Sequence, residues 1–242
     1  MDTFSFSRLN LFETCARRFY YKYILQWCDP VGLPAIFGQT VHKAIELMVT
    51  HGYSLDGAVL QAWVHEAEMS ESIPREEIEK HAKVAQIAMR TVIRNINAET
   101  HFVMELAEDV KLQGYIDLHG TQRDGYEAVV DWKTGRNQFD VLSNWQIPLY
   151  AAYVMKNTGC DAVMGMLVFT RFNSVKREII TKDIAEQAIE WAVNTAKTIQ
   201  SRIEYATIMS KKEIVRFAFP SSPCGECSHC PWARECLVDD SK

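Results

Sequence analysis

A buried strand that ends in charged residues constrains this chain more than any other stretch. The segment Val129–Gly135 opens with two β-branched residues and breaks at a Thr-Gly pair, which predicts a strand that ends there. Asp131 and Lys133 are two residues apart, so their side chains leave one face of an extended backbone while Trp132 points to the other. A carboxylate and an ammonium therefore converge on one spot. Because most such pairs are exposed salt bridges, a catalytic interpretation needs partners elsewhere in the chain.

The length and composition fit one folded domain over residues 1–242. Of the 242 residues, 48% are hydrophobic, which is enough to bury a core. The sequence has no apolar run of about eighteen residues and no basic-then-apolar leader, which predicts no membrane span, no secretory signal and a cytoplasmic location. The net charge of -5 argues against a protein that coats nucleic acid by bulk attraction, although it permits a local basic groove.

The first hundred residues are predicted to be mainly helical. Ser7 can cap a helix over residues 8–26, in which apolar residues recur every three or four positions. After a loop rich in Pro and Gly, a second helix is expected over residues 38–51 and carries His42. Residues 55–98 are expected to be helical throughout, as a lid or insertion whose His and Glu residues form a solvated face.

After residue 101 the hydrophobic period changes to that of β-strands. An antiparallel meander is expected from three strands, with a hairpin turn between the last two, over residues 102–106, 111–118 and 126–131. Asp117 is a charge inside an otherwise apolar strand, next to the strand that carries Asp131. A carboxylate in that position is costly unless it is paired or bound to a cation.

A further helix is expected to begin near Trp145, because Pro148 is tolerated only in a first turn. Gln146 and Tyr150 are four residues apart and therefore share a face of this helix. The remaining expected elements are two strands and a long final helix, over residues 162–172, 176–180 and 183–205.

Several short segments resemble the motifs of a known family. In chain order they are Gly38–Glu46, Gly114–Asp117, Asp131–Gly135 and Gln146–Tyr150. Together they resemble the PD-(D/E)XK nuclease superfamily, and more closely its RecB-like branch. The opening segments Phe6–Leu9 and Phe12–Phe19, with the closing cysteines, are similar to its iron-sulfur members. These include the AddB nuclease domain and the CRISPR-associated RecB-like exonucleases.

The resemblance implies an α/β fold with a restriction-endonuclease-like core, in which helices flank a mixed central sheet. A helical insertion at about residues 55–98 and a C-terminal cysteine-rich cluster region would be added to that core. Hydrolysis of a phosphodiester requires charge neutralisation at phosphorus, an activated water and help for the leaving oxygen, which divalent ions can supply.

The candidate metal ligands are an imidazole and oxygen donors. Asp117 and Asp131 offer the oxygen ligands that Mg²⁺ or Mn²⁺ prefers, whereas His42 suits Mn²⁺ better than Mg²⁺. By resemblance these three positions bind metal, and the backbone carbonyl of Trp132 contributes as well. Lys133 would orient or deprotonate the attacking water and stabilise charge on the phosphate. The same resemblance implies that two further residues position the lysine or the DNA strand, namely Gln146 and Tyr150.

A basic and aromatic segment follows Cys15. Aromatic residues in such a segment usually serve packing. Arg17 and Arg18 could nonetheless contact phosphates while Tyr20 stacks on a base.

The odd number of cysteines, seven, makes a disulfide framework the less favoured use. Four of them lie close together near the C-terminus, at Cys224, Cys227, Cys230 and Cys236, which suggests a metal or cluster. The resemblance assigns a 4Fe-4S cluster to four of them, Cys15, Cys227, Cys230 and Cys236. Because Cys224 is an extra thiol in the C-terminal group, a rival zinc site is also open, formed by Cys224, Cys227, Cys230 and Cys236. Cys28 and Cys160 are expected to be ordinary thiols.

Three hypotheses for function follow. The leading one is a metal-dependent exonuclease that degrades single-stranded DNA ends, from the 5′ end by resemblance, in recombination, repair or end processing. The second makes the chain a nuclease subunit of a helicase-nuclease or CRISPR spacer-acquisition complex, with a helicase, a recombinase or a CRISPR integrase as partner. Since no Gly-x4-Gly-Lys-Ser/Thr loop is present, the motor would be a separate protein. The third is a non-catalytic, cluster-stabilised DNA-binding module.

Overall fold

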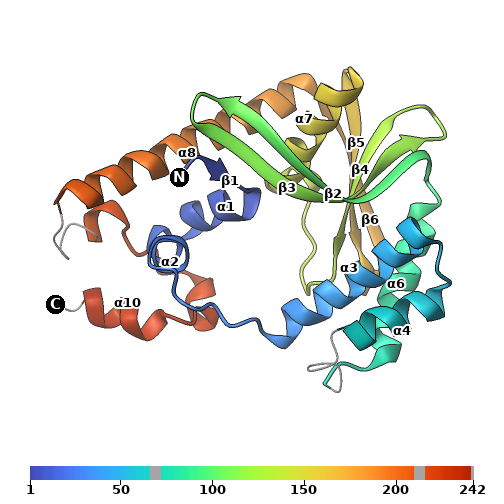
Figure 1. Cartoon of the computed structure of the whole chain (residues 1–242), viewed down its shortest axis with the longest axis horizontal. Coiled ribbons are helices and arrows are strands. Elements are labelled where there is room, and N and C mark those ends of the chain that lie inside the picture. The colour runs from blue at the N-terminus through green and yellow to red at the C-terminus, as the bar shows by residue number, and fades with distance from the viewer. Residues whose placement is uncertain (66–71, 210–215, 241–242) are drawn as a thin grey trace. The chain divides into compact units, whose positions relative to one another are not determined.

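The computed structural model describes residues 1–65, 72–209 and 216–240 (Figure 1). The chain forms two compact units. Unit 1 comprises Met1–Pro30, Val103–Gln113 and Glu190–Lys242. Unit 2 comprises Val31–Phe102 and Gly114–Ile189. Each unit combines distant parts of the sequence, so neither corresponds to one continuous stretch of chain.

The strands of the described residues form one six-stranded mixed sheet. They are β1 (Thr3–Phe4), β2 (Val92–Ala107), β3 (Val110–Gln122), β4 (Glu127–Lys133), β5 (Ala162–Phe169) and β6 (Ser174–Thr181). Their order is β1-β3-β4-β5-β6, and β2 pairs with β3. The pairs β1/β3 and β4/β5 are parallel, whereas β3/β4 and β5/β6 are antiparallel. Helices flank this mixed sheet, which confirms the expected restriction-endonuclease-like architecture.

In unit 2, alternate residues of the central strands face two different layers of helices. One layer consists of three helices that pack together (Figure 1). They are α3 (Leu33–His51), α4 (Leu55–His65) and α6 (Arg75–Met89). The strand residues in their core include Ala128, Val130, Trp132, Met166 and Val168. Gly165 faces the other way, since a Cβ built on it would lie 2.5 Å from Ile147 of α7 (Gln146–Thr158). Even-numbered positions of β4 therefore face α3, and odd-numbered positions face α7.

Two expectations for unit 2 were wrong at element boundaries, and one was confirmed. Residues 92–98 are strand rather than helix. The first half of β2 is largely exposed, so its sequence has no apolar period from which a strand could be predicted. Helix α3 begins at Leu33 rather than residue 38, with Pro34 in its first turn, where a missing N–H is tolerated. The expected helix start near Trp145 is confirmed, since Trp145 caps α7.

Unit 1 contains the N-terminal helices, most of α8 (Lys182–Met209), the 3-10 helix η4 (Gly225–His229) and α10 (Ala233–Asp240). The single helix expected over residues 8–26 is in fact α1 (Phe6–Thr14), α2 (Ala16–Phe19) and a π-helical turn, η1 (Tyr20–Ile24). Cys15 breaks it with an extended backbone, and Ser5 rather than Ser7 caps α1 by accepting the Arg8 N–H.

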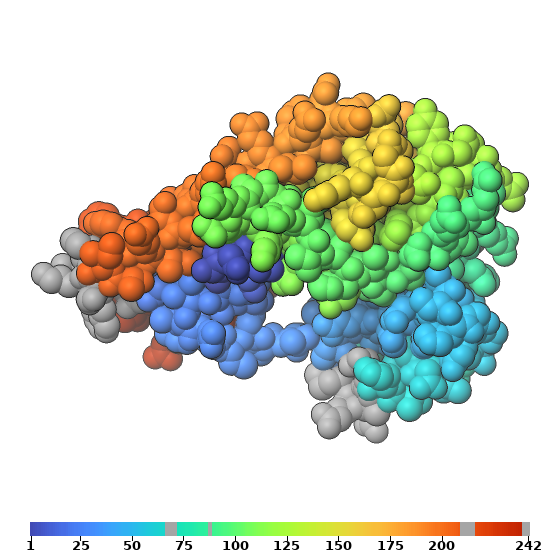
Figure 2. All heavy atoms as spheres, turned by 45° about the horizontal axis from the view of Figure 1, so that its top comes forward, coloured from blue at the N-terminus to red at the C-terminus, as the bar shows by residue number. Residues whose placement is uncertain are grey.

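The start of the chain lies against α8, as the dark-blue and orange surfaces in Figure 2 show. Gln200 of α8 donates a hydrogen bond to the backbone oxygen of Met1 over 3.0 Å. None of the helices in the described part of the chain combines the length and apolar character that crossing a membrane requires.

Candidate active site

The end of β4 places Asp131 and Lys133 together on the face toward α7, as their spacing predicts. Lys133 Nζ lies 2.7 Å from Asp131 Oδ2. Asp131 is buried, and within the described residues its Oδ2 accepts no hydrogen bond of regular geometry, so the ammonium is its closest ionic contact. Trp132 buries its ring on the opposite face. Its backbone N–H and carbonyl nevertheless remain at the strand end, where the site forms.

The first turn of α7 holds both charged groups in place. Gln146 accepts a hydrogen bond from Lys133 Nζ at its Oε1 (2.9 Å) and donates from Nε2 to Asp131 Oδ1 (3.0 Å). The same Nε2 lies 3.2 Å from the hydroxyl of Tyr150, one helical turn further on. Asn144 fixes the helix start by accepting the Gln146 N–H at 3.0 Å. Gln146 therefore connects the lysine with the aspartate, and the Tyr150 hydroxyl contacts the amide nitrogen of Gln146.

Helix α3 brings His42 to the same strand end. Its Nε2 lies 3.0 Å from the backbone oxygen of Trp132. Its Nδ1 lies 3.4 Å from Asp117 Oδ1. The other oxygen of Asp117 accepts the Trp132 N–H over 2.8 Å. β3 and β4 pair with Leu118 opposite Val130, so the antiparallel register brings Asp117 next to Asp131.

Glu99 is a third carboxylate of the site that was not predicted from the sequence. Its Oε1 lies 3.8 Å from His42 Nδ1. The possible ligand atoms of His42, Glu99 and Asp117 all lie within 4.8 Å of one another. Glu99 belongs to the part of β2 next to the wrongly predicted helix, and its φ of 47° breaks the regular alternation of the strand. Since no spacing rule connects it to Asp117, only the fold reveals it.

The ionisation behaviour of the site follows from burial and from crowded carboxylates. Burial and the nearby Asp131 charge raise the pKa of Asp117 to about 6, although His42 opposes this. Burial alone would lower the pKa of His42, but Asp117, Glu99 and Asp131 outweigh it and hold that pKa well above its ordinary value. Burial raises the pKa of the Tyr150 hydroxyl, which therefore stays protonated. In the absence of a cation, protons compensate the crowded negative charge.

The donor set fits a divalent cation. With His42 neutral, as a ligand must be, three carboxylates face one ammonium, and this leaves two uncompensated negative charges. Carboxylate oxygens, a backbone carbonyl and one imidazole are the donors that Mn²⁺ or Mg²⁺ takes. Among the described residues, those whose ligand atoms lie close enough together to share an ion are His42, Glu99 and Asp117. Asp131, which is paired with Lys133, and the Trp132 carbonyl lie beside them at the strand end.

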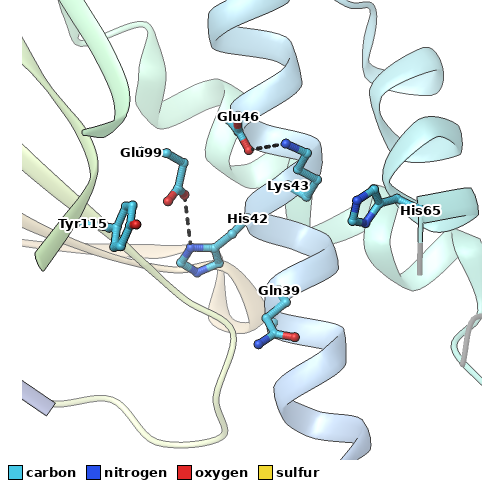
Figure 3. Close-up of a pocket in the computed structure, with 8 residues that line it drawn as sticks. Gln39, His42, Lys43, Glu46, His65, Glu99 and Tyr115 are labelled. Atoms are coloured by element: carbon cyan, nitrogen blue, oxygen red, sulfur yellow. Dashed lines mark hydrogen bonds and ion pairs between the residues drawn. The ribbon is translucent and has the colours of Figure 1, made fainter. Parts of the chain in front are cut away.

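A pocket opens beside these ligands (Figure 3). It is open to solvent and has a volume of about 580 Å³, within the range of small-molecule sites. One wall is a face of α3 with side chains at helical spacing, namely Gln39, His42, Lys43 and Glu46. Glu99 and Tyr115 come from the strands, and Figure 3 shows both next to His42.

Hydrogen bonds that begin at α6 also hold the end of β4 that carries Lys133. Thr170 donates a hydrogen bond to the backbone oxygen of Lys133 over 3.2 Å, and His81 Nδ1 lies 2.7 Å from the same hydroxyl. His81 is buried, which lowers its pKa and favours the neutral imidazole. The expectation that the histidines of this helical segment are solvated was therefore wrong for His81.

The candidate cluster cysteines belong to unit 1. Cys15 lies between α1 and α2, Cys227 is on η4, Cys230 ends η4, and Cys236 is on α10. The N–H of Cys224 points to Cys227 Sγ at 3.3 Å. Among the described residues, the group of ligand atoms within 4.8 Å of one another contains no cysteine.

Packing nonetheless connects the two ends of the chain in unit 1. Arg17 is buried, and its Nε donates to the backbone oxygen of Phe219 over 2.7 Å. Its N–H bonds to the backbone oxygen of Pro220 at 3.1 Å. The ring of Tyr20 lies 5.0 Å from that of Phe219. Arg17, one of the candidate DNA contacts, thus has a structural partner, whereas Arg18 is partly exposed.

A mixed sheet that gathers carboxylates, a lysine and a helical histidine at one strand end is the arrangement of a metal-dependent nuclease. The chain matches the PD-(D/E)XK nuclease superfamily over residues 3–237 and belongs to it. The superfamily predicted from the four motifs is therefore confirmed.

Part of the chain is similar in sequence to a subunit of a bacterial helicase/deoxyribonuclease. It is 27% identical over 157 residues to the B subunit of the ATP-dependent helicase/deoxyribonuclease of Streptococcus pyogenes serotype M6. The same-named protein of serotype M49 is 26% identical over 157 residues. Each match covers 57% of this chain and 14% of the relative, so the chain spans a small part of these proteins. The crystal structure of SSO0001 aligns with 98% of this chain and 87% of that one, at 14% identity and a TM-score of 0.44.

Proposed function

We propose that this chain is a metal-dependent deoxyribonuclease that hydrolyses single-stranded DNA from its ends, in the 5′ to 3′ direction. The observation that supports this most is the pairing of Lys133 with Asp131 and Gln146, beside the group of His42, Glu99 and Asp117. Buried carboxylates without enough positive charge beside them destabilise a fold, so they are not expected in a scaffold protein. A metal-dependent hydrolase needs them to bind its cation. A cytoplasmic location is part of the same proposal.

Each side chain has a separate task in the reaction. When bound, a divalent cation supplies charge neutralisation at the phosphate and acidity for water. Lys133 Nζ, held by Gln146, orients the attacking water and stabilises the charge that develops on the phosphate oxygens. Asp131 keeps the ammonium close to the strand end. Tyr150, whose hydroxyl stays protonated, keeps the Gln146 amide in the orientation that serves both partners.

The test uses single strands labelled at either end, with and without Mn²⁺. Wild type should release labelled mononucleotides or short fragments only with the cation, and the label released first gives the polarity. Lys133→Ala should lose roughly 100-fold or more in rate, because a positioned acid-base group contributes on that order. Lys176→Ala is the matched control, since Lys176 also pairs with an aspartate, Asp140, but lies outside the site. Equal rates for wild type and Lys133→Ala would refute the enzymatic proposal.

The proposal includes a 4Fe-4S cluster on Cys15, Cys227, Cys230 and Cys236. Its support is the packing in unit 1, where the residues beside Cys15 contact those beside the C-terminal cysteines. Besides the Arg17 bonds, Tyr21 and Trp27 place their rings 6.0 Å and 6.4 Å from that of Trp232, which lies between Cys230 and Cys236. In the zinc alternative Cys224 replaces Cys15 as a ligand. That site would not explain why the residues beside Cys15 contact those beside the C-terminal cysteines.

Single cysteine variants separate the two metals. Protein prepared without oxygen should be brown and contain iron and sulfide. Cys15→Ser should lose the colour, Cys224→Ser should keep it, and Cys28→Ser is a matched control because Cys28 is an exposed cysteine of the same unit. A colourless wild type that contains zinc, and loses it in Cys224→Ser but not in Cys15→Ser, would establish the zinc site instead.

The pathway and partners are also part of the proposal. The relatives named as helicase/deoxyribonuclease subunits support a role beside a helicase, in recombination, repair or end processing. A subunit of a CRISPR spacer-acquisition complex, with an integrase as partner, is the second candidate and rests on the motif resemblance. Arg18 and Tyr20 are proposed DNA contacts.

A further inference from the structure

We infer that the pocket of Figure 3 binds an unpaired nucleobase, which stacks on Tyr115 next to the metal ligands. The inference rests on the proposed nuclease function and adds the feature by which the site would recognise a single strand. Tyr115 lines the pocket together with His42 and Glu99, and 58% of it is exposed. A large aromatic ring left in solvent beside a catalytic group is an available surface for a planar ligand.

The ring is held in position before any ligand binds. Tyr115 is on β3, whose neighbour β2 carries His101, and the two rings lie 4.8 Å apart at an angle of 40°. Tyr115 lines the pocket and His101 does not, so His101 supports the ring from outside. Because a tyrosine on a paired strand has few rotamers to lose, stacking on it costs little conformational entropy.

The opposite wall offers groups for the edge of a base. Gln39 is on the same face of α3 as His42, and among the described residues its amide has no hydrogen-bond partner. An amide can both donate to and accept from a base edge, so it suits all four bases. Lys43 instead pairs with Glu46 over 2.8 Å, so its ammonium already has an anionic partner. An uncommitted amide opposite an aromatic ring, beside a lysine that is already paired, fits a base better than a phosphate.

Tyr115 and Asp117 leave the same face of β3, because they are two residues apart on an extended strand. Tyr115 precedes Asp117 by two residues on β3, which separates their Cα atoms by about 7 Å. A phosphate at the ligands therefore leaves the base of an adjacent nucleotide within reach of the ring. Both faces of a base in a duplex are covered by its neighbours, so only an unstacked base can occupy this place. The pocket thus favours single-stranded over paired DNA.

An abasic scan tests the inference. A series of labelled single strands, each lacking one base near the end, is bound to the protein in Ca²⁺ on a Lys133→Ala background, and affinity is read from anisotropy. One position should weaken binding by about tenfold, since one stacked base contributes on that order. Tyr115→Ala should weaken binding of the intact strand by the same factor and abolish the effect of the abasic position. Tyr115→Phe should bind as well as the parent, because stacking needs the ring and not the hydroxyl.

The outcomes separate this inference from the proposed function. Tyr126→Ala is the matched control, because Tyr126 is an exposed tyrosine of unit 2 that does not line the pocket, and it should change nothing. If no abasic position weakens binding, or if Tyr115→Ala binds intact DNA like the parent, base stacking is refuted while nuclease activity stands. The abasic scan itself is carried out with Tyr115 intact. It therefore tests base stacking even if Tyr115→Ala does not fold. A wild type that binds Mn²⁺ but neither binds nor cuts DNA would refute both.

Discussion

Replacing Asp117 with asparagine should change how the stability of the metal-free protein depends on pH. In the metal-free state Asp117 is buried near Asp131, and this raises its pKa from 3.8 to about 6. Such a carboxyl prefers to be protonated in the folded protein. Ionising it therefore destabilises the fold, whereas an asparagine side chain at this position would carry no charge at any pH.

The magnitude follows from the two pKa values. A tenfold change in acidity corresponds to about 1.4 kcal/mol, so a rise from 3.8 to about 6 makes the ionised carboxyl destabilising by about 3 kcal/mol. The loss begins as the pH rises through 3.8, where unfolded Asp117 ionises, and is complete above about 6, where the folded form ionises as well. Relative to wild type, Asp117→Asn should therefore gain about 3 kcal/mol between about pH 3.5 and pH 7.

Three histidines also contribute to the pH dependence, and a comparison of wild type with Asp117→Asn cancels the contributions of the two that do not contact Asp117. His42, whose pKa is raised, stabilises the fold at low pH and loses that effect as the pH rises. Burial lowers the pKa values of His81 and His119, which act in the opposite sense because they resist protonation in the folded state. His81 and His119 lie outside the pair and contribute alike to both proteins. His42 contacts Asp117, so its raised pKa should fall in the variant and reduce the pH dependence further.

Urea unfolding with a chelator present, across this pH range, measures the difference directly. Saturating Mn²⁺ should reverse the order, because wild type then binds the cation and the variant lacks one ligand. A variant that tracks wild type in parallel at all pH values without metal would refute the reasoning. It would mean that the Asp117 carboxyl is as well stabilised in the fold as in water.

Two other substitutions test the surroundings of the site. Glu99→Gln should weaken Mn²⁺ binding by at least roughly tenfold in calorimetry, while Glu46→Gln, in the same pocket but paired with a lysine, should leave it unchanged. Gly114→Ala should destabilise the protein by about 1 to 3 kcal/mol in urea unfolding and slow cleavage, with Mn²⁺ binding retained. The reason is that the new Cβ would lie 2.9 Å from Phe102 and 3.1 Å from Tyr150, so these rings must move.

The parts of the site that the sequence predicted are those governed by local periodicity. Asp131 and Lys133 follow the two-residue repeat of a strand, and Gln146 and Tyr150 the four-residue repeat of a helix. In the structure these two pairs meet, because the odd-numbered face of β4 packs against α7. The register that brings Asp117 to Asp131 depends on a turn of known length, so it too was predictable in outline.

The residues that were missed are brought in by contacts between segments distant in sequence. Glu99 lies on a strand whose exposed half has no apolar period, and His81 on a helix whose polar residues were expected to form a solvated face. Neither has a fixed spacing to its partner, since His81 reaches Thr170 and Glu99 reaches His42 only after the sheet and helices have packed. Local patterns cannot predict such pairings.

These long-range contacts change how the helical segment before β2 should be understood. A lid would cover the site and leave it intact when open. Here α6 packs into the core under β4 and β5, and its His81 supports Thr170, which in turn bonds to the Lys133 carbonyl. Movement of α6 would therefore disturb the strand end that carries the lysine. The segment is thus a structural support of the strand that carries Lys133, and substitutions in its buried face should reduce activity together with stability.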